Sequence, residues 1–179
     1  MSAKKLIVCV CRGNILRSAI AEKLINNQLD INGLSDKYEV ISRSIQGTTL
    51  DTKPVRYPNL TYYSEVYQRV KPILDELNVD LSQHVSTAIN NQTATSAAHI
   101  FAMDKLTKSA LETLFPDHAN KILLFSDLVE HIDEVADVPY YTKPTYSIKT
   151  IQEIKGILDK GIGSLLTLVE TGNLPEKSV

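Results

Sequence analysis

The sequence predicts an α/β fold with a doubly wound parallel sheet, on the basis of three observations. A short continuous apolar run, Leu6–Val10, is typical of a strand that is covered on both faces. Apolar residues then recur at helical spacing until Gly33, and a second strand is expected over Tyr38–Ser42. A strand, a helix and a strand in this order form a right-handed crossover unit, with which doubly wound sheets usually begin.

The next part of the chain continues the alternation of strands and helices. The polar stretch from Arg43 to about Leu60 predicts a long loop, and loops of that length are often functional. The elements expected after it are a helix over Tyr62–Leu77, a buried strand over His99–Met103, a helix from Asp104 or Lys105 to Phe115, and a buried strand over Ile122–Phe125.

The last predicted element is a long helix with one apolar stripe from Ile151 to Val169. Gly156, Gly161 and Gly163 lie within it and weaken its intrinsic helix propensity. The sequence contains no repeat and no linker that would divide it. Residues 1–171 are therefore expected to form a single domain, with 172–179 as a frayed tail.

Length and composition point to an ordinary globular protein. The chain has 179 residues, of which 43% are hydrophobic and 22% charged, so it can bury a core without disulfide bonds. Lys plus Arg is 19 and Asp plus Glu is 21, which leaves a net charge of −2 and does not indicate a nucleic acid or an anionic membrane as partner. No apolar stretch reaches the length of a membrane span.

The cysteines and histidines indicate neither a disulfide framework nor a metal site. Cys9 and Cys11 are the two cysteines, one residue apart, which favours a reduced, cytoplasmic setting. The four histidines are scattered without the spacing of metal ligands. We expect no metal and no organic cofactor.

The stretch CRGNILRS, residues 11–18, stands where the first strand passes to the first helix. In an open parallel sheet, ligands bind beyond the carboxyl ends of the strands at such a place. Gly13 is expected to let the backbone amides turn toward an anion, the following helix adds its positive end, and Arg17 offers a planar fork for two oxyanion oxygens. Thiols at helix N-termini and beside cations have pKa values of about 3.5–7.5, so Cys11 is expected to be a ready nucleophile.

This stretch resembles the phosphate-binding loop of the low-molecular-weight protein tyrosine phosphatases, whose pattern is C-x-G-N-x-C-R-S near the N-terminus. Three further segments are similar to segments of that family: SRSIQGT at 42–48, LNVDLSQHVS at 77–86 and FAMDK at 101–105. The resemblance implies a four-stranded parallel, flavodoxin-like sheet with helices on both faces.

The resemblance also implies roles for individual residues. Cys11 would be the nucleophile and Arg17 the phosphate clamp, while His84 would support the shape of the loop. Ser18 would donate a hydrogen bond to the thiolate. The residues implied in substrate binding are Arg12, Gly13, Asn14, Ile15, Leu16 and Ser18 in the loop, and Tyr140 and Tyr141 at the entrance.

The sequence can be aligned with the family in two ways at the general acid. The family carries D-P-Y-Y or D-x-P-D-P late in the chain, and the corresponding stretch here is ADVPYYTKP, residues 136–144. Against the first pattern Asp137 is the acid with Val138 inserted; against the second, Tyr140 occupies the place of the acid. We favour Asp137, because a loop absorbs one inserted residue more easily than the reaction dispenses with its proton donor.

Two residues of the loop region depart from the family pattern. Leu16 replaces the second cysteine of the loop, so the disulfide that family members form under oxidation cannot form in that way. Cys9 is either its substitute or, as we favour, a small buried residue of the strand. Arg12 either adds positive potential at the rim of the pocket or is simply solvated. Outside the loop, Asp104 is expected to be a helix N-cap rather than a catalytic group.

These observations predict a cysteine-dependent phosphatase that acts on phosphotyrosyl proteins or aryl phosphates through a cysteinyl-phosphate intermediate. Ile15 favours phosphotyrosine, because relatives acting on phosphoarginine tend to have threonine at that position of the loop. Two alternatives stay open. One is an arsenate reductase, and the other is a phosphate-binding relative of low turnover.

Overall fold

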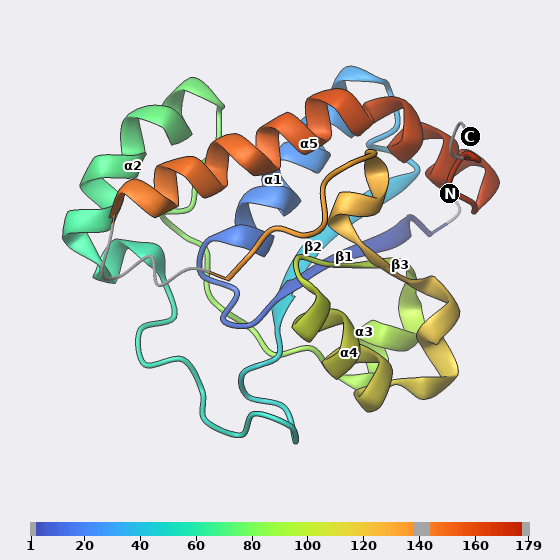
Figure 1. Cartoon of the computed structure of the whole chain (residues 1–179), viewed down its shortest axis with the longest axis horizontal. Coiled ribbons are helices and arrows are strands. Elements are labelled where there is room, and N and C mark those ends of the chain that lie inside the picture. Colours follow the sequence, from blue (N-terminus) through green and yellow to red (C-terminus); the bar gives the residue numbers. More distant parts are fainter. Residues whose placement is uncertain (1–2, 138–143, 177–179) are drawn as a thin grey trace.

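The computed structural model describes residues 3–137 and 144–176. Four parallel strands form one sheet in the order β2-β1-β3-β4 (Figure 1). The strands are β1 (Lys5–Cys11), β2 (Tyr38–Ser44), β3 (Ala97–Ala102) and β4 (Ile122–Leu124). The predicted four-stranded parallel sheet is confirmed.

Helices cover both faces of this sheet (Figure 1). On one face lie α1 (Arg17–Ile31), α2 (Ser64–Glu76) and α5 (Pro144–Thr171), and on the other lie α3 (Asn91–Ser96) and α4 (Lys105–Leu114). The short 3₁₀ helices are η1 (Leu60–Tyr62), η2 (Pro116–Lys121) and η3 (Phe125–Leu128). In the described part of the chain, no helix combines the length and the apolar character needed to span a membrane.

The alternation of side chains along β1 divides the core into two layers. Ile7, Cys9 and Cys11 belong to the layer beneath α1, α2 and α5, whereas Val8 and Val10 belong to the layer beneath α3 and α4. This follows from the two-residue repeat of a strand, which sends successive side chains to opposite faces. Cys11 at the end of β1 therefore faces the helix that follows it.

The order of the strands places a crevice next to Cys11. The chain leaves β1, passes through α1 to β2 on one side, and later returns to β3 on the other side of β1. Connections that diverge in this way open a crevice beyond the carboxyl ends of the two central strands. Cys11 ends β1 and Asp104 follows the end of β3, so both residues border that crevice.

The regions of α2 and α3 differ from the sequence prediction. The helix expected over Tyr62–Leu77 is divided into η1 and α2, because Tyr63 leaves the helical conformation at ψ 64°. Helix α3 was not expected, since its six residues show no apolar period. It begins after Asn90, whose side chain accepts a hydrogen bond from the Thr93 backbone N–H at 2.8 Å.

The glycines of α5 are not equivalent. A Cβ atom at Gly161 would lie 2.8 Å from both the Cβ and the carbonyl oxygen of Leu128, whereas a Cβ at Gly156 or Gly163 would meet nothing within 4 Å. Gly161 thus allows η3 to lie directly against α5.

We expect Gly161→Ala to destabilise the fold by about 1–3 kcal/mol, because the added methyl group overlaps with the backbone of η3. The control Gly163→Ala should stabilise it by about 0.5–1 kcal/mol, because alanine replaces glycine inside a helix without a clash. Urea denaturation measures both changes in the free energy of unfolding. Equal effects of the two substitutions would show that the contact between Gly161 and Leu128 does not matter.

Candidate active site

The loop of residues 12–16 joins β1 to α1, and four successive carbonyl groups at its start are turned outward. Each accepts a hydrogen bond from a neighbouring segment: Cys11 O from Ile45 N at 3.1 Å, Arg12 O from Gln46 N at 2.9 Å, Gly13 O from Ser86 Oγ at 2.7 Å, and Asn14 O from His84 Nε2 at 2.8 Å. Since a carbonyl oxygen only accepts, Nε2 of His84 carries the proton. These contacts fix the direction of every peptide plane from 11 to 14.

Because a trans peptide directs its C=O and its N–H to opposite sides, the N–H groups of the same planes point inward. One of them, Asn14 N–H, donates to Cys11 Sγ at 3.2 Å. The start of α1 adds N–H groups that have no acceptor within the helix. Within the described residues, the N–H groups of Ile15, Leu16, Arg17 and Ser18 meet no protein acceptor. The loop is therefore a cradle of N–H donors, as suits an anion.

The sulfur of Cys11 lies at this cradle and has two hydrogen-bond partners. Ser18 Oγ is 3.1 Å from Sγ and itself accepts a hydrogen bond from Asn14 Nδ2 at 3.0 Å. With a lone pair of Ser18 Oγ engaged by Asn14, the hydroxyl proton is available to Sγ. Ser18 Oγ and Asn14 N therefore both donate a hydrogen bond to Sγ.

Asn14 is the residue that connects the loop to the sheet. It is fully buried, and its amide group also donates to Ser42 Oγ at 2.8 Å and accepts from Thr87 N at 3.1 Å. Ser42 Oγ donates in turn to Glu22 Oε2 at 2.6 Å. A chain of hydrogen bonds thus runs from a carboxylate on α1 through β2 to the loop.

Asn14, rather than Gly13, adopts the unusual backbone conformation of the loop. The sequence predicts this freedom at Gly13, but the left-handed residue is Asn14, with φ 51°. Asparagine tolerates this region because its short side chain can hydrogen-bond locally. Gly13 is small for another reason: a Cβ there would lie 3.2 Å from Gln46 Oε1 and 3.5 Å from Val55 Cγ1.

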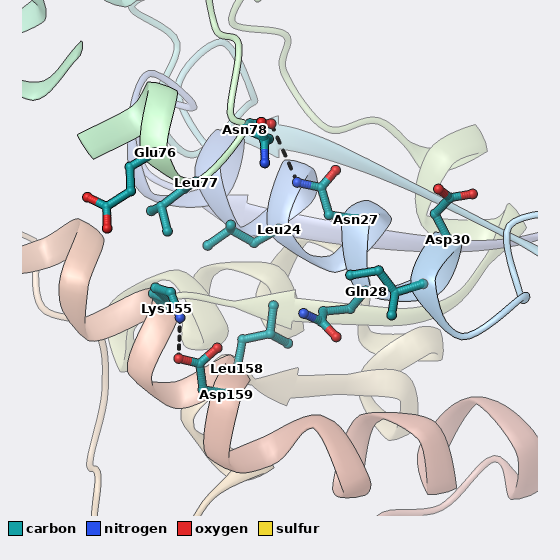
Figure 2. A pocket seen from close by; sticks show the side chains of 11 residues that line it. Leu24, Asn27, Gln28, Asp30, Glu76, Leu77, Asn78, Lys155, Leu158 and Asp159 are labelled. Carbon is teal, nitrogen blue, oxygen red and sulfur yellow. Dashed lines mark hydrogen bonds and ion pairs between the residues drawn. The ribbon is translucent and has the colours of Figure 1, made fainter. Parts of the chain in front are cut away.

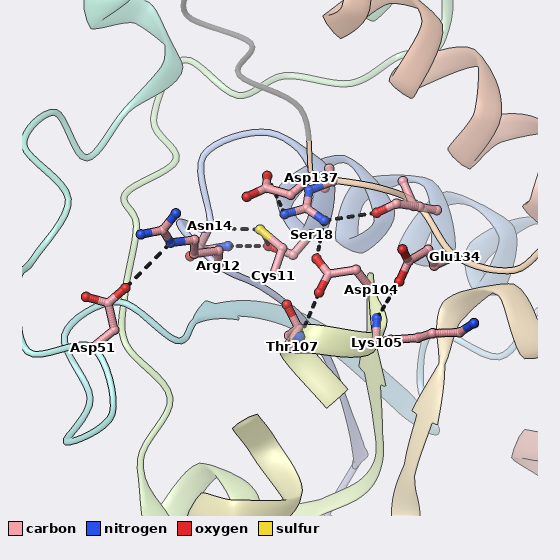
Figure 3. A network of polar contacts seen from close by, with 12 residues as sticks. Cys11, Arg12, Asn14, Ser18, Asp51, Asp104, Lys105, Thr107, Glu134 and Asp137 are labelled. Atoms are coloured by element: carbon pink, nitrogen blue, oxygen red, sulfur yellow. Dashed lines mark hydrogen bonds and ion pairs between the residues drawn. The ribbon is translucent and has the colours of Figure 1, made fainter. Parts of the chain in front are cut away.

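Arg17 is buried at the start of α1 and forms a polar network there, and Figure 3 labels its partners Asp104 and Asp137. Its Nη1 donates to Asp104 Oδ2 and, at 2.9 Å, to the carbonyl oxygen of Val135, while its Nη2 donates to Asp137 Oδ1 at 2.6 Å. A guanidinium has five N–H donors. Three are used here, and the Nε–H and one Nη2–H meet no other acceptor in the described part of the chain.

The charge of Arg17 is secured by its surroundings. Burial opposes the charge, but Cys11, Asp137 and Asp104 outweigh it and raise the pKa of the guanidinium. Val135 contributes through its backbone, since its N–H donates to Met103 O at 2.9 Å while its carbonyl accepts from Arg17. This double contact places the segment containing Asp137 beside the end of β3.

Cys9 is the second free cysteine and is inaccessible to solvent. Burial, the Glu22 carboxylate and Cys11 raise the pKa of its thiol. Cys9 therefore behaves as a small apolar residue of β1, with little tendency to form the thiolate that disulfide exchange requires.

Comparison with known proteins agrees with this geometry. A sequence model of the low molecular weight phosphotyrosine protein phosphatase family matches residues 6–171. The chain belongs to this family. Among curated protein sequences, none matches it.

Solved structures show the same fold. The low molecular weight protein tyrosine phosphatase from T. tengcongensis is 26% identical with a TM-score of 0.70, over 89% of this chain and 99% of that one. A protein tyrosine phosphatase from Entamoeba histolytica is 22% identical with a TM-score of 0.71, over 96% and 100%. The YwlE arginine phosphatase from Geobacillus stearothermophilus is 20% identical with a TM-score of 0.70, over 96% and 99%. This chain is accordingly a cysteine-based phosphatase of the low-molecular-weight class.

The structure brings most of the predicted site residues of this phosphatase together. Cys11 and Ser18 are hydrogen-bonded to each other, and Arg17 is paired with Asp137. The two groups lie close enough for Cys11 to act electrostatically on Arg17. The side chains of Ile15 and Leu16 are buried in the core, so only their backbone N–H groups are available to a bound anion. Tyr140 and Tyr141 lie outside the described residues.

Several partners of Arg17 and of the 12–16 loop are not among the site residues predicted from the sequence. Asp104 is the predicted N-cap of α4, accepting from Thr107 N at 2.6 Å, but it also pairs with Arg17. The signal was available: an acidic residue directly after the strand that pairs with β1 borders the same crevice. The sequence carries no such signal for the contact of the Val135 carbonyl with Arg17 or of the Ser86 hydroxyl with the Gly13 carbonyl. Both contacts depend on how the loops pack.

Away from the active site, a cavity of about 370 Å³ lies between α1, the end of α2 and α5 (Figure 2). Leu24, Leu77 and Leu158 form its apolar part, and Lys155 and Asp159 form an ion pair at its edge. It shares no residue with the 12–16 loop.

In the ranges 3–137 and 144–176 we find no group of His, Cys, Asp or Glu side chains arranged to hold a metal ion.

Replacing Asp104 separates its two roles. Asp104→Asn keeps a good N-cap but removes the charge beside Arg17, and we expect a loss of about 3 kcal/mol in the free energy of unfolding, at the low end for breaking a buried ion pair. Asp104→Ala should cost about 1 kcal/mol more, because the cap is lost as well.

The matched control is Asn90→Ala, which removes the side-chain cap of α3 and has no link to Arg17. It should cost only about 1 kcal/mol. Urea denaturation measures all three variants. A stability of Asp104→Asn equal to that of the wild type would mean that the pair with Arg17 does not stabilise the fold.

Proposed function

We propose that this phosphatase hydrolyses phosphotyrosyl proteins or aryl phosphates through a cysteinyl-phosphate intermediate. The observation that carries the proposal is the position of Cys11 Sγ at a cradle of inward N–H groups, beside the guanidinium of Arg17. A phosphate group is the tetrahedral anion that such a cradle and a planar fork suit. The free thiols Cys9 and Cys11 fit a reducing, cytoplasmic setting.

In the first step, the thiolate of Cys11 attacks phosphorus. The S–P bond forms while the bond from phosphorus to the phenolic oxygen breaks. The inward N–H groups and the Nε–Nη2 edge of Arg17 stabilise the charge on the phosphoryl oxygens. The phosphate accepts from the remaining Nε–H and Nη2–H, beside the Nη2–H that meets Asp137. Asp137 in its protonated form gives its proton to the leaving phenolate and remains as a carboxylate, ready for the second step.

In the second step, water attacks the phosphorus of the cysteinyl phosphate. Asp137 takes a proton from this water, the new P–O bond forms, and the S–P bond breaks to release phosphate and the thiolate. The hydrogen bonds from Ser18 Oγ and Asn14 N to Sγ make the sulfur a better leaving group.

The choice between phosphotyrosine and phosphoarginine as substrate depends on the loop rather than on the fold. The comparisons include protein tyrosine phosphatases and an arginine phosphatase at similar TM-scores, so the fold does not choose between them. Ile15 stands where phosphoarginine-specific relatives tend to have threonine, and this supports phosphotyrosine.

The first test removes the nucleophile. Cys11→Ser should reduce phosphate release from p-nitrophenyl phosphate by roughly 10⁴-fold or more, because the hydroxyl of serine is a poor nucleophile without a base beside it. Calorimetry should still detect inorganic phosphate binding to the intact N–H groups. The control Cys9→Ala should keep nearly full activity. Wild-type turnover by Cys11→Ser would contradict the proposal.

The second test concerns the general acid. General acid catalysis contributes about 10²–10⁴-fold, and the need for it rises with the basicity of the leaving group. The wild type should therefore hydrolyse phenyl phosphate and nitrophenyl phosphate at similar maximal rates, and Asp137→Asn should slow phenyl phosphate far more than nitrophenyl phosphate.

Tyr140→Phe serves as the comparison variant and should have the smaller effect. A steep dependence on the leaving group in the wild type that Asp137→Asn leaves unchanged would remove Asp137 from the mechanism. A wild type that binds phosphate but releases none from either ester would identify a phosphate-binding relative of low turnover.

A further inference from the structure

A cavity of about 250 Å³ lies directly beside the 12–16 loop, on the other face of the sheet from α1. Ile45, Leu106 and Ala110 supply its apolar walls, and Thr107 contributes from the first turn of α4. The volume is below that of typical small-molecule sites, about 300–1,000 Å³, and suits a single bulky side chain.

The cavity borders the proposed phosphate site. Arg12 follows the nucleophile directly in the chain, and Asp104 and Asp137 both bind Arg17, yet all three also line the cavity. Figure 3 shows these groups around Cys11, with Arg12 and Asp51 on one side and Asp104 and Thr107 on another. A group bound at Cys11 thus has this cavity as its immediate neighbour.

Leu106 is the residue of the cavity that most clearly indicates a bound apolar group. Its side chain is 84% exposed at the start of α4, although it stands beside the apolar walls formed by Ile45 and Ala110. A single exposed leucine needs no explanation. An exposed leucine at the mouth of an apolar cavity next to a catalytic loop offers surface that a ligand can cover.

The charges around the cavity argue against an acidic occupant. Three carboxylates line it, those of Asp51, Asp104 and Asp137. They outnumber the two guanidinium groups that pair with them, Arg12 at the cavity and Arg17 behind it. Arg12 is itself paired with Asp51, at 3.6 Å between Nε and Oδ2, and is mostly solvated. An exposed pair of this kind contributes only about 0–1 kcal/mol, so the apolar walls dominate the selectivity of the cavity.

We propose that this cavity binds a bulky apolar side chain of the substrate, on a residue that flanks the phosphotyrosine. The inference rests on the proposed phosphotyrosyl activity and specifies its substrate class. Leu106, Ile45 and Ala110 cover the apolar side chain, while the carboxylates at the rim disfavour an acidic residue there.

Phosphotyrosyl peptides that differ at one flanking position test this. Two series carry Leu, Ala or Glu directly before or directly after the phosphotyrosine, and kcat/KM is measured for each peptide. In one series the wild type should prefer Leu to Ala by about tenfold, the low end for apolar groups in a substrate pocket. The Glu peptide should be no better than the Ala peptide.

Leu106→Ser should reduce the Leu-to-Ala ratio to about one to two. The exposed side chain makes this substitution compatible with folding. Ala110→Phe, which fills the cavity, should reduce the ratio as well. The control Ile31→Ser removes another exposed apolar side chain, at the far end of α1, and should keep the wild-type ratio. Because each ratio is taken within one variant, changes in the chemical step cancel.

Equal kcat/KM for Leu and Ala peptides in both series, or an unchanged ratio in Leu106→Ser, would overturn the inference. A preference for Glu would also overturn it and would assign recognition to Arg12 instead. These outcomes differ from a failure of the proposed function, in which neither p-nitrophenyl phosphate nor any peptide releases phosphate.

Discussion

The site depends on the outward hydrogen bonds of four consecutive carbonyl groups, from Cys11 to Asn14. A peptide plane cannot direct its carbonyl and its N–H to the same side, so holding these oxygens from outside turns the donors inward. The four bonds come from two segments, Ile45 with Gln46 and His84 with Ser86. The shape of the anion cradle is therefore set by residues that need not touch the anion.

The buried arginine shows a second constraint. A guanidinium at 4% exposure is tolerable because most of its donors are bonded and its charge is compensated. Asp104 and Asp137 supply the compensation and the carbonyl of Val135 supplies a further acceptor. The same contacts hold the segment after η3 against the carboxyl edge of the sheet. One ion-pair network thus stabilises the fold and orders the groups that we assign to the reaction.

The carboxyl edge of the sheet serves two purposes in our interpretation. On the face of α1 it presents the sulfur and the N–H groups, and on the face of α4 it presents the apolar cavity. The strand alternation that sends Cys11 to one face and Val10 to the other makes this division possible. Asp104 lies between the two regions, since it bonds to Arg17 and also lines the cavity.

The sequence by itself determined the parallel α/β architecture and the position of the nucleophile. It could do so because apolar periodicity and the strand–loop–helix order of CRGNILRS depend on neighbouring residues. The position of Asp104 as the cap of α4 was predictable for the same reason. The pairing of Cys11 with Ser18 also lies within one short segment.

Only the tertiary structure decided what surrounds these residues. Arg17 meets Asp104, Val135 and Asp137 across 87, 118 and 120 residues of chain, and no local pattern encodes which of the many carboxylates reaches it. The left-handed conformation falls on Asn14 rather than Gly13, and the Asn14 side chain is held there by bonds to Ser42 and Thr87, residues distant in the chain. The cavity beside Leu106 likewise exists only where segments distant in the chain pack side by side.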